Sequence, residues 1–446
     1  MSSFLLLFLV FFPLLAAYFV YPMRRRGRKY RNLYVRIIPG AELLAAALLL
    51  FAPGTVRLPQ LCGLGMEFGA GSLHTTLAVL AAFLWLMTAL PCKEYFAERE
   101  GVNRFYCSWM MTLGALMGVF LAADFFTLFI FFEIMSFASY VWVAQNENPN
   151  ALRAGQTYLA VAVLGGMLLL VGLLMLQHLL GSLTFRELPA LAAALEDGRR
   201  GELLAAGLFC LAGFGAKAGM VPLHIWLPKA HPVAPAPASA LLSGILTKSG
   251  IFGILIVSRY LLADSLDWSA ALLISGTVTM LLGAVLALFS VNLKRALACS
   301  SMSQIGFILI GVAMQGYLGE ENALAAWGTV LHMMNHGLIK LVLFVSAGVI
   351  YVATHALDLN GLRGWGRNKP LLKGIFFIGA AAIVGVPGTA GYISKTLLHE
   401  SIVEHIHHLE RLGLSAGGFR AVEWLFLLSG GLTAAYMTKL FAAIFV

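Results

Sequence analysis

The dominant pattern along the chain is a succession of long apolar stretches, separated by short segments that hold most of the charged side chains. A stretch of about 20 apolar residues is long enough to cross a lipid bilayer as an α-helix. Thirteen candidate spans lie near residues 2–21, 34–53, 73–92, 105–122, 125–145, 154–180, 203–222, 236–262, 268–290, 296–316, 322–353, 374–404 and 421–446. The pattern therefore predicts an all-α polytopic membrane protein.

Composition narrows the class of protein further. Of the 446 residues 60% are hydrophobic and 11% are charged, and the mean hydropathy is +0.86. Soluble domains average about 25% charged residues, so soluble enzymes, nucleic-acid-binding proteins and disordered scaffolds are excluded. The formal net charge of +9 is attributed to basic loops on one side of a membrane, and no nucleic-acid partner is expected.

The basic residues also predict an orientation. The apolar run from Ser2 to Val20 has no basic residue before it and six between Arg24 and Arg31, which favours a first span with its N-terminus outside over a cleaved signal peptide. With that orientation, 17 of the 30 Lys and Arg residues lie in inner loops and 7 in outer loops. Positive loops stay on the cytoplasmic side, so we expect a multi-pass protein of the cell (plasma) inner membrane.

Cysteine usage argues against a redox centre on this chain. The five cysteines form no CxxC pair, so neither an iron–sulfur cluster nor a zinc site has its usual ligand spacing. We expect no metal or cofactor site here, and any redox chemistry is assigned to another chain. These cysteines are Cys62, Cys92, Cys107, Cys210 and Cys299.

Ionisable side chains occur deep inside several spans. Glu133 lies mid-span in FFTLFIFFEIMSFASYVWV (125–143), Lys217 lies in GFGAKAGMVPLHIWLPKAH (213–231), and Lys248 follows in ASALLSGILTKSGIFGILIV (238–257). A charge at the centre of a span costs about 2.5–3.5 kcal/mol on translocon-based scales, so each group needs a partner or a water-filled path. A Glu and a Lys at similar depth can form an ion pair.

A second set of these groups shares one helical stripe. His332, His336 and Lys340 recur every four residues in LHMMNHGLIKLVLFVSAG (331–348), which places neighbours about 6 Å apart along a helix axis. Lys395, in GVPGTAGYISKTLLHES (385–401), completes the row. Together these groups predict a polar string across several helices, although His332 or Lys340 taken singly could be a helix–helix hydrogen bond.

Other charged residues have simpler explanations or stay open. Lys439, Arg36 and Glu423 lie near span ends, where side chains can extend to the membrane surface. The sequence assigns no role to Glu42 or Asp124.

Two spans look broken. Proline has no N–H to donate to the residue four back, so Pro222 frees the carbonyl of Ala218, and Pro387 frees that of Ile383. Interrupted helices at membrane depth mark ion and substrate sites in transporters, although a proline kink alone is common.

The broken seventh and twelfth spans are five helices apart and run in opposite directions, as two inverted five-helix repeats would produce. The predicted parts are 1–104, 105–262 with spans four to eight, and 263–446 with spans nine to thirteen.

Five of the 15 prolines fall in PLHIWLPKAHPVAPAPAS (222–239), which predicts a stiff elbow between the seventh and eighth spans. His224 and His231 lie in this elbow at the predicted cytoplasmic edge. They could take up protons there, and a loop-packing role is an equal alternative.

Several long motifs resemble the antiporter-like, proton-translocating membrane subunits of respiratory complex I, group 4 membrane-bound hydrogenases and Mrp-type Na⁺/H⁺ antiporters. GAKAG followed by PLHIWLPKAH leans toward the hydrogenase-4 and formate hydrogenlyase branch. The resemblance runs from about Phe105 to Ser401. Its motifs are FFE at Glu133, AKAGMVPLHIWLPKAH at Lys217, SALLSGILTKSG at Lys248, LKRALACSSMSQIGFILIG (293–311), HMMNHGLIKLVLFVSAG (332–348) and GVPGTAGYISK at Lys395.

The resemblance implies a fold of about 13–14 transmembrane helices, with two inverted repeats and broken helices 7 and 12. It also implies that Glu133 and Lys217 form a switching ion pair, that Lys248 and the stripe on 331–348 carry protons, and that Lys395 is the terminal group. The implied partners are other antiporter-like and small membrane subunits, redox subunits with iron–sulfur clusters, and the lipid bilayer. The family sometimes has a long lateral helix at the C-terminus, whereas this chain stops at Val446 in an apolar stretch, which leaves a short member and a truncated one as alternatives.

The main functional prediction is therefore a proton-translocating subunit that couples electron transfer to ion pumping in a larger redox complex. The nearest alternative is a subunit of an Mrp-type Na⁺/H⁺ antiporter, in which the same residues exchange Na⁺. A membrane acyltransferase with His336 as base leaves the buried lysines unexplained, and a solute symporter lacks a visible polar substrate pocket.

Overall fold

The structure, a computed structural model, describes every residue except 62, 64 and 98, so Cys62 lies outside the described residues. The elements in chain order are α1 (Ser2–Tyr18), α2 (Val20–Arg26), α3 (Arg28–Leu49), β1 (Thr55–Leu58), β2 (Met66–Gly69), α4 (Ser72–Ala89), α5 (Cys92–Tyr95), α6 (Val102–Phe120), α7 (Phe125–Ala144), α8 (Pro149–Leu180), α9 (Leu188–Ala193), η1 (Asp197–Arg199), α10 (Arg200–Ala218), η2 (Leu223–Ile225), α11 (Trp226–Val233), α12 (Ala236–Leu241), the π-helical turn η3 (Leu242–Leu246), α13 (Thr247–Tyr260), α14 (Leu266–Phe289), α15 (Leu293–Leu318), η4 (Gly319–Glu321), α16 (Ala323–Thr354), α17 (Pro370–Val384), α18 (Ala390–Arg411) and α19 (Gly417–Phe445).

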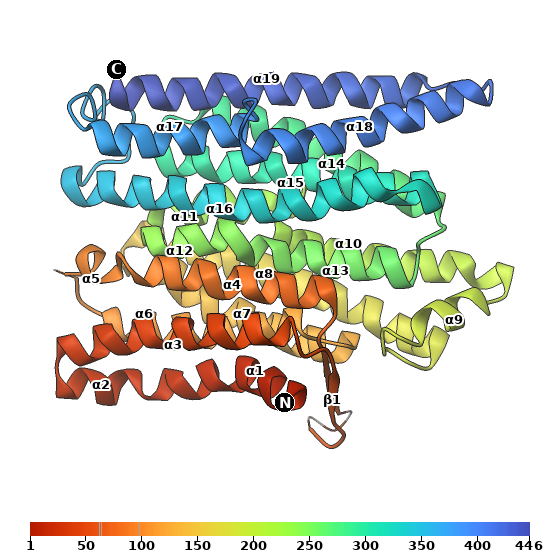
Figure 1. Cartoon of the computed structure of the whole chain (residues 1–446), viewed down its shortest axis with the longest axis horizontal. Coiled ribbons are helices and arrows are strands. Elements are labelled where there is room, and N and C mark those ends of the chain that lie inside the picture. Colours follow the sequence, from red (N-terminus) through yellow and green to blue (C-terminus); the bar gives the residue numbers. More distant parts are fainter. Residues whose placement is uncertain (62, 64, 98) are drawn as a thin grey trace. The chain divides into compact units, whose positions relative to one another are not determined.

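The predicted all-α membrane architecture is confirmed (Figure 1). Among the described residues, ten helical segments are long and apolar enough to cross a membrane, or eleven if α1 and α2, bent by 48°, count as one span. The remaining two predicted spans correspond to α6 and to the broken pair α17 and α18. Each of these helices is either too short or not apolar enough to be counted among the ten.

Contacts divide the chain into two compact units. Unit 1 comprises Met1–Phe214 and Val233–Leu241, and unit 2 comprises Gly215–Pro232 and Leu242–Val446. Within unit 1, α6 lies against α1 and α7, while within unit 2 α14 lies along α15 and α16 along α18. Each unit therefore buries its apolar helix faces against neighbours of its own.

Close approach of α14 and α15 depends on two glycines. A Cβ on Gly283 would lie 2.4 Å from the backbone N of Ser303, and a Cβ on Gly306 would lie 2.3 Å from the backbone N of Met280. Neither backbone can move aside at a low cost in energy, so the two helices can meet only because Gly283 and Gly306 have no side chains. This contact helps to bury α15 completely along its apolar length.

The seventh predicted span breaks at a glycine rather than at the proline. The α10 helix ends at Ala218, and Gly219 adopts a left-handed conformation with φ 82°. The N–H of Met220 then bonds to the carbonyl of Gly215 at 2.9 Å, which is the 6→1 bond of a Schellman motif. The helix has therefore already stopped before Pro222.

The twelfth predicted span breaks in the same way. The α17 helix ends at Val384, and Gly385 follows with φ 91°. The chain resumes as a helix at Ala390, after Pro387 and a second left-handed glycine, Gly388. The last carbonyls of α17 therefore have no partner further along their own helix.

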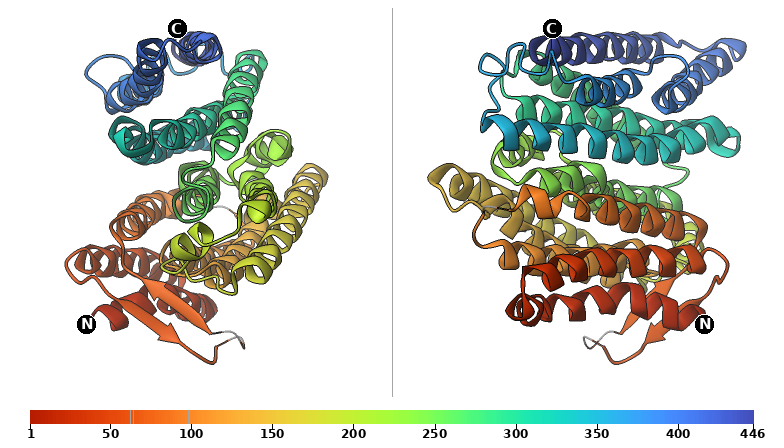
Figure 2. Two further views of the ribbon diagram at one scale, coloured as in Figure 1. Left: turned by 90° about the vertical axis from the view of Figure 1, so that its right-hand side faces the viewer. Right: turned by 60° about the vertical axis from the view of Figure 1, so that its left-hand side comes forward.

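A β-hairpin lies at one end of the helices of unit 1, near the N-terminus (Figure 2). Its antiparallel strands pair Thr55 with Gly69 and Leu58 with Met66. The β2 strand continues into the segment before α7, since the N–H of Ala123 bonds to the carbonyl of Glu67 at 2.9 Å. The hairpin thereby fixes the backbone from which α7 starts.

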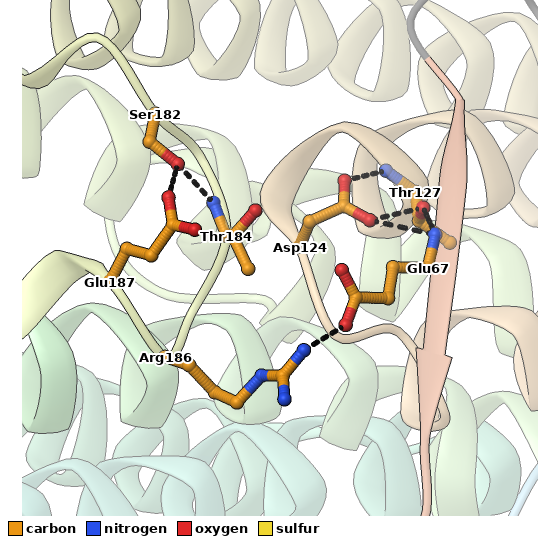
Figure 3. A network of polar contacts seen from close by, with 7 residues as sticks. All are labelled: Glu67, Asp124, Thr127, Ser182, Thr184, Arg186 and Glu187. Atoms are coloured by element: carbon orange, nitrogen blue, oxygen red, sulfur yellow. Dashed lines mark hydrogen bonds and ion pairs between the residues drawn. The ribbon is translucent and has the colours of Figure 1, made fainter. Parts of the chain in front are cut away.

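Side chains complete this corner as a set that we call the hairpin network (Figure 3). Asp124 caps α7 by accepting the Thr127 N–H at 2.7 Å, and it also accepts the Glu67 N–H at 3.0 Å. Burial raises the pKa of Asp124, and the hydrogen bonds from Thr127 and Glu67 oppose that rise. Arg186 donates to Glu67 Oε1 at 2.6 Å. The other members are Ser182, Thr184 and Glu187.

Candidate functional site

Five of the predicted site residues gather inside unit 2, and we call them the basic string. Each has at most 8% of its surface exposed. They lie on α13, α16 and α18, and α15 supplies polar partners between these helices. The basic string consists of Lys248, His332, His336, Lys340 and Lys395.

The closest contact in the string joins Lys248 and His336. Lys248 Nζ lies 2.6 Å from His336 Nδ1, and it donates a hydrogen bond of 2.6 Å to the carbonyl of Ser243. Ser243 lies in the π-helical turn η3, and its carbonyl also accepts a hydrogen bond from the Thr247 hydroxyl at 3.1 Å. This turn thus supplies an acceptor to the buried ammonium.

Lys340 lies one turn after His336 on α16, and its partners come from α15. Its Nζ donates to the carbonyl of Leu297 at 2.8 Å and to the hydroxyl of Ser300. A buried ammonium needs such acceptors because burial without hydrogen bonds is costly. Neutral acceptors hold the side chain but do not fix its charge as a carboxylate would.

His332 continues the string in the other direction along α16. Its Nε2 lies 3.1 Å from Gln304 Oε1 on α15, and its Nδ1 lies 2.9 Å from Ser394 Oγ on α18. The rings of His332 and His336 are stacked with centroids 6.5 Å apart. Both ring nitrogens of His332 therefore face groups that can exchange hydrogen bonds, and the string passes from α16 to α18.

Lys395 ends the string beside the break between α17 and α18. Its Nζ donates to the carbonyls of Ile383 at 2.8 Å and Val384 at 3.3 Å. The Ile383 carbonyl is the one that the position of Pro387 led us to expect free. The ammonium also lies 4.8 Å from the ring centroid of Phe307, a favourable cation–π arrangement.

Glu133 and Lys217 fall in different compact units. Glu133 lies on α7 in unit 1, where its carboxylate lies against α8 so closely that a Cβ on Gly166 would be 2.5 Å from Oε1. Lys217 is 4% exposed and lies in unit 2, one residue before the end of α10. The ion pair between them stays a prediction.

The two histidines of the elbow differ in their surroundings. His231, on α11, is fully buried and stacks on Phe344 of α16, with centroids 4.7 Å apart and planes at 17°. Phe344 lies one helical turn beyond Lys340, so His231 extends the line of the basic string. His224 lies in η2 and is half-buried, and it takes no part in the hydrogen-bonded contacts described above.

Sequence reasoning missed the uncharged partners of the string. Ser300 and Gln304 lie four residues apart in ACSSMSQIGF (298–307), in an otherwise apolar helix. Their spacing places them on one face, which was the available signal. Ser301 from the same run contacts Ser243 Oγ at 2.6 Å, which brings α15 against η3. Ser394 escaped notice because a single serine in a span commonly bonds its own helix backbone.

Comparisons with known proteins bear on the family and the fold of this chain. Residues 122–410 match the family described as "NADH:quinone oxidoreductase/Mrp antiporter, TM". "Hydrogenase-4 component B" of Escherichia coli (strain K12) is 33% identical over 386 residues, which cover 84% of this chain and 56% of that protein. "NAD(P)H-quinone oxidoreductase chain 4 1" of Picosynechococcus sp. is 32% identical over 397 residues, which cover 87% of this chain and 69% of that protein.

The fold has counterparts among solved structures. A chain of the membrane-bound sulfane sulfur reductase (MBS), an archaeal respiratory membrane complex, matches with a TM-score of 0.88 at 22% identity, covering 100% of this chain and 88% of that one. At that identity the match concerns the fold alone. Because the family match extends over more than half of the sequence, the resemblance is confirmed, and the chain belongs to the NADH:quinone oxidoreductase/Mrp antiporter family of multi-pass membrane subunits.

Proposed function

We propose that this chain is the proton-translocating subunit of a multisubunit, redox-driven membrane complex. The observation that carries the proposal is the basic string, in which Lys248 and His336 lie 2.6 Å apart while both are buried. A structural core has no use for two basic groups in direct contact away from water. A proton path needs such a pair, because each member can accept a proton that the other releases.

Electrostatic repulsion couples the protonation of neighbouring groups in the string. Two positive charges at this separation repel strongly where the effective dielectric constant is low, so the pair Lys248 and His336 holds one proton more readily than two. A proton that arrives from the side of Lys340 or His231 therefore drives another toward His332. Gln304 and Ser394, which hold both nitrogens of His332, orient the ring for transfer toward Lys395.

The switch in this proposal is the pair Glu133 and Lys217. A carboxylate near an ammonium favours its protonated form, and its withdrawal favours release. Movement of Glu133 toward or away from Lys217 would then alter the proton affinity at one end of the path. His231, and His224 at the edge of the same elbow, are the proposed groups for proton uptake.

The partners follow from the same reasoning. Within the described residues, no group of three or more His, Cys, Asp or Glu side chains is arranged to hold a metal ion, and we assign the redox centres to separate iron–sulfur subunits. Other antiporter-like and small membrane subunits complete the complex. The proposed location is the plasma membrane, with the N-terminus outside. The match covers 56% and 69% of the length of these two relatives.

The test is redox-driven proton uptake by inverted membrane vesicles that contain the tagged, assembled complex. Lys217→Ala and Lys395→Ala should each abolish acidification, whereas Lys369→Ala, at an exposed lysine, should not. Unchanged pumping in both site variants would show that the proposed path is wrong. Iron and flavin in the purified complex would support redox coupling.

The family description also names Mrp antiporters, so Na⁺/H⁺ exchange is the second candidate. The same vesicles distinguish the two. Acidification that needs an electron donor and proceeds without Na⁺ supports the redox-driven pump. Proton movement that follows an imposed Na⁺ gradient, in a purified complex without iron or flavin, supports the antiporter.

A further inference from the structure

The helix that carries Lys395 becomes strongly polar beyond it. Four residues later α18 presents His399, and Glu400, Glu404 and His407 follow before the helix ends at Arg411. With a rise of 1.5 Å per residue, the helix end lies about 24 Å from Lys395 along the axis. On the predicted topology this end faces the outside, which makes the outer half of α18 a route between the basic string and the outer surface.

His399 lies between two carboxylates from different helices. Its Nδ1 is 3.5 Å from Glu400 Oε1, and its Nε2 is 3.3 Å from Glu423 Oε1 on α19. The side chains of His399 and Glu423 are 23% and 26% exposed. A residue that only extended toward the membrane surface would need no partner on a neighbouring helix, so the contact with His399 argues for a more specific role of Glu423.

Two aromatic rings connect Lys395 with His399. The Lys395 ammonium lies over Phe307, Phe307 meets Phe426 edge to face at 4.6 Å, and Phe426 lies 5.9 Å from the His399 ring. Lys395 and His399 are also one turn apart on the same side of α18. Apolar rings at this point limit the entry of water between Lys395 and His399. Proton transfer between these two residues therefore depends on whether water enters.

Beyond His399 an open cavity of about 760 Å³ reaches the molecular surface. Its charged lining consists of Glu400, Glu404, His407, Glu410 and Arg411. The half-exposed Glu400 belongs both to this lining and to the contact with His399. The cavity therefore offers carboxylates and water to a proton that leaves the histidine.

We infer that His399, which lies against Glu423, is the relay through which protons leave Lys395 for the outer surface. When water enters between the two groups, the His399 ring accepts the proton that the Lys395 ammonium gives up, and Lys395 is left as a neutral amine. The imidazolium then gives its proton to Glu400, and from that carboxyl group it passes to water in the cavity. This inference rests on the proposed function and adds the exit group that the basic string lacks.

The test uses the same vesicles and the fully assembled complex. His399→Gln should lower redox-driven proton transport on the order of 100-fold, the scale of a lost proton-transfer group, while assembly and electron transfer without a gradient persist. His408→Gln, at an exposed histidine on the same helix, should transport at the unmodified rate. In His399→Gly, added imidazole should restore transport by entering from the cavity, which a merely structural histidine would not allow.

The outcomes separate this inference from the proposed function. If the unmodified complex pumps and Lys395→Ala does not, but His399→Gln pumps normally, then the exit lies elsewhere and the basic string stands. If His399→Gly loses transport and imidazole fails to restore it, His399 is structural and the relay is wrong. If the unmodified complex moves no protons, the proposed function fails first.

Glu423→Gln should slow proton transport less than His399→Gln does, and Glu423→Asp should recover most of the transport.

Discussion

Buried polar groups have partners of different chemistry in the hairpin network of unit 1 and the basic string of unit 2. Asp124 is fixed by the N–H and hydroxyl of Thr127 and by the N–H of Glu67, all of which are donors that keep their protons at physiological pH. Lys248 instead contacts His336, a group that can hold or release a proton. Burial is therefore common to both sets, and the chemistry of the partners distinguishes them.

The comparison also explains why each set lies where it does. The hairpin network satisfies backbone groups at the start of α7, where a helix leaves its first N–H groups without partners. The basic string instead lies within the helices, and its lysines bond to backbone carbonyls there. Lys395 bonds to carbonyls at the end of α17, where the helix stops, whereas Lys248 bonds to a carbonyl of η3 and Lys340 to one within α15. A helix break therefore supplies the acceptors of Lys395.

Among the variants that test this comparison, the largest effect should come from Lys248→Met, which keeps most of the length of the side chain and removes the ionisable amine. Transport by the assembled complex should fall on the order of 100-fold, measured as acidification of inverted vesicles. Lys248→Arg should be almost as inactive, because a guanidinium cannot give up its proton in a protein. Normal pumping by Lys248→Arg would show that the string needs positive charge only, and the contrast with the hairpin network would disappear.

Glu133 is the acid in unit 1 that we assign to function, and Gly166→Ala tests it without changing its chemistry. The new Cβ would lie 2.5 Å from Glu133 Oε1, and the flexible carboxylate can move aside at little cost in stability. Misplacement of a reacting group by about 1 Å can cost up to about 100-fold in rate, and we expect a loss on the order of tenfold. Gly430→Ala, at a glycine with open space around it, is the matched control.

If Gly166→Ala pumps normally, then the position of the Glu133 carboxylate is not critical and the switch must be sought elsewhere. If it lowers the unfolding temperature in detergent along with transport, then α7 and α8 have been pushed apart and Glu133 has not been tested. A Gly166→Ala variant with lower transport and unchanged stability is the informative result.

Much of the fold was predictable because transmembrane helices follow from runs of apolar residues. The breaks at the seventh and twelfth spans were predictable from Gly and Pro, although α10 ends through the left-handed Gly219 rather than through Pro222. The spacing of His332, His336 and Lys340 already placed them on one stripe. The Ile383 carbonyl was expected free, and Lys395 does bond to it.

The partners of the string were not predictable, because they are neutral residues from distant parts of the sequence. Gln304 and Ser394 meet at His332 only when α15, α16 and α18 come together. For a related reason His399 was not singled out, and Glu423 was interpreted as a span-end residue that extends to the membrane surface, since each alone resembles a polar residue near the end of a span. Tertiary contacts alone show that they face each other.

The hairpin network should respond in stability and not in transport. Asp124→Ala removes the cap of α7 and one of the two acceptors of the Glu67 N–H, the other being the Thr127 hydroxyl, which together cost about 1–3 kcal/mol. The thermal midpoint in detergent should fall, while transport per assembled complex stays unchanged. Asp124→Asn keeps a capping oxygen and should recover most of the stability. A loss of transport in Asp124→Asn at normal stability would make this carboxylate part of the proton path.

The smallest effect should come from Arg186→Ala, because its side chain is 70% exposed whereas that of Glu67 is 8% exposed. Water can replace the guanidinium at Glu67 Oε1, so the loss should lie within about 1 kcal/mol, as for other exposed ion pairs. Salt screens such a pair, and the difference from the unmodified protein should shrink at high ionic strength. Arg153→Ala, at an exposed arginine on α8, should show no such dependence. A loss above about 3 kcal/mol that salt leaves unchanged would mean that Glu67 stays shielded from water when Arg186 is gone, as in a buried pair that has lost one partner.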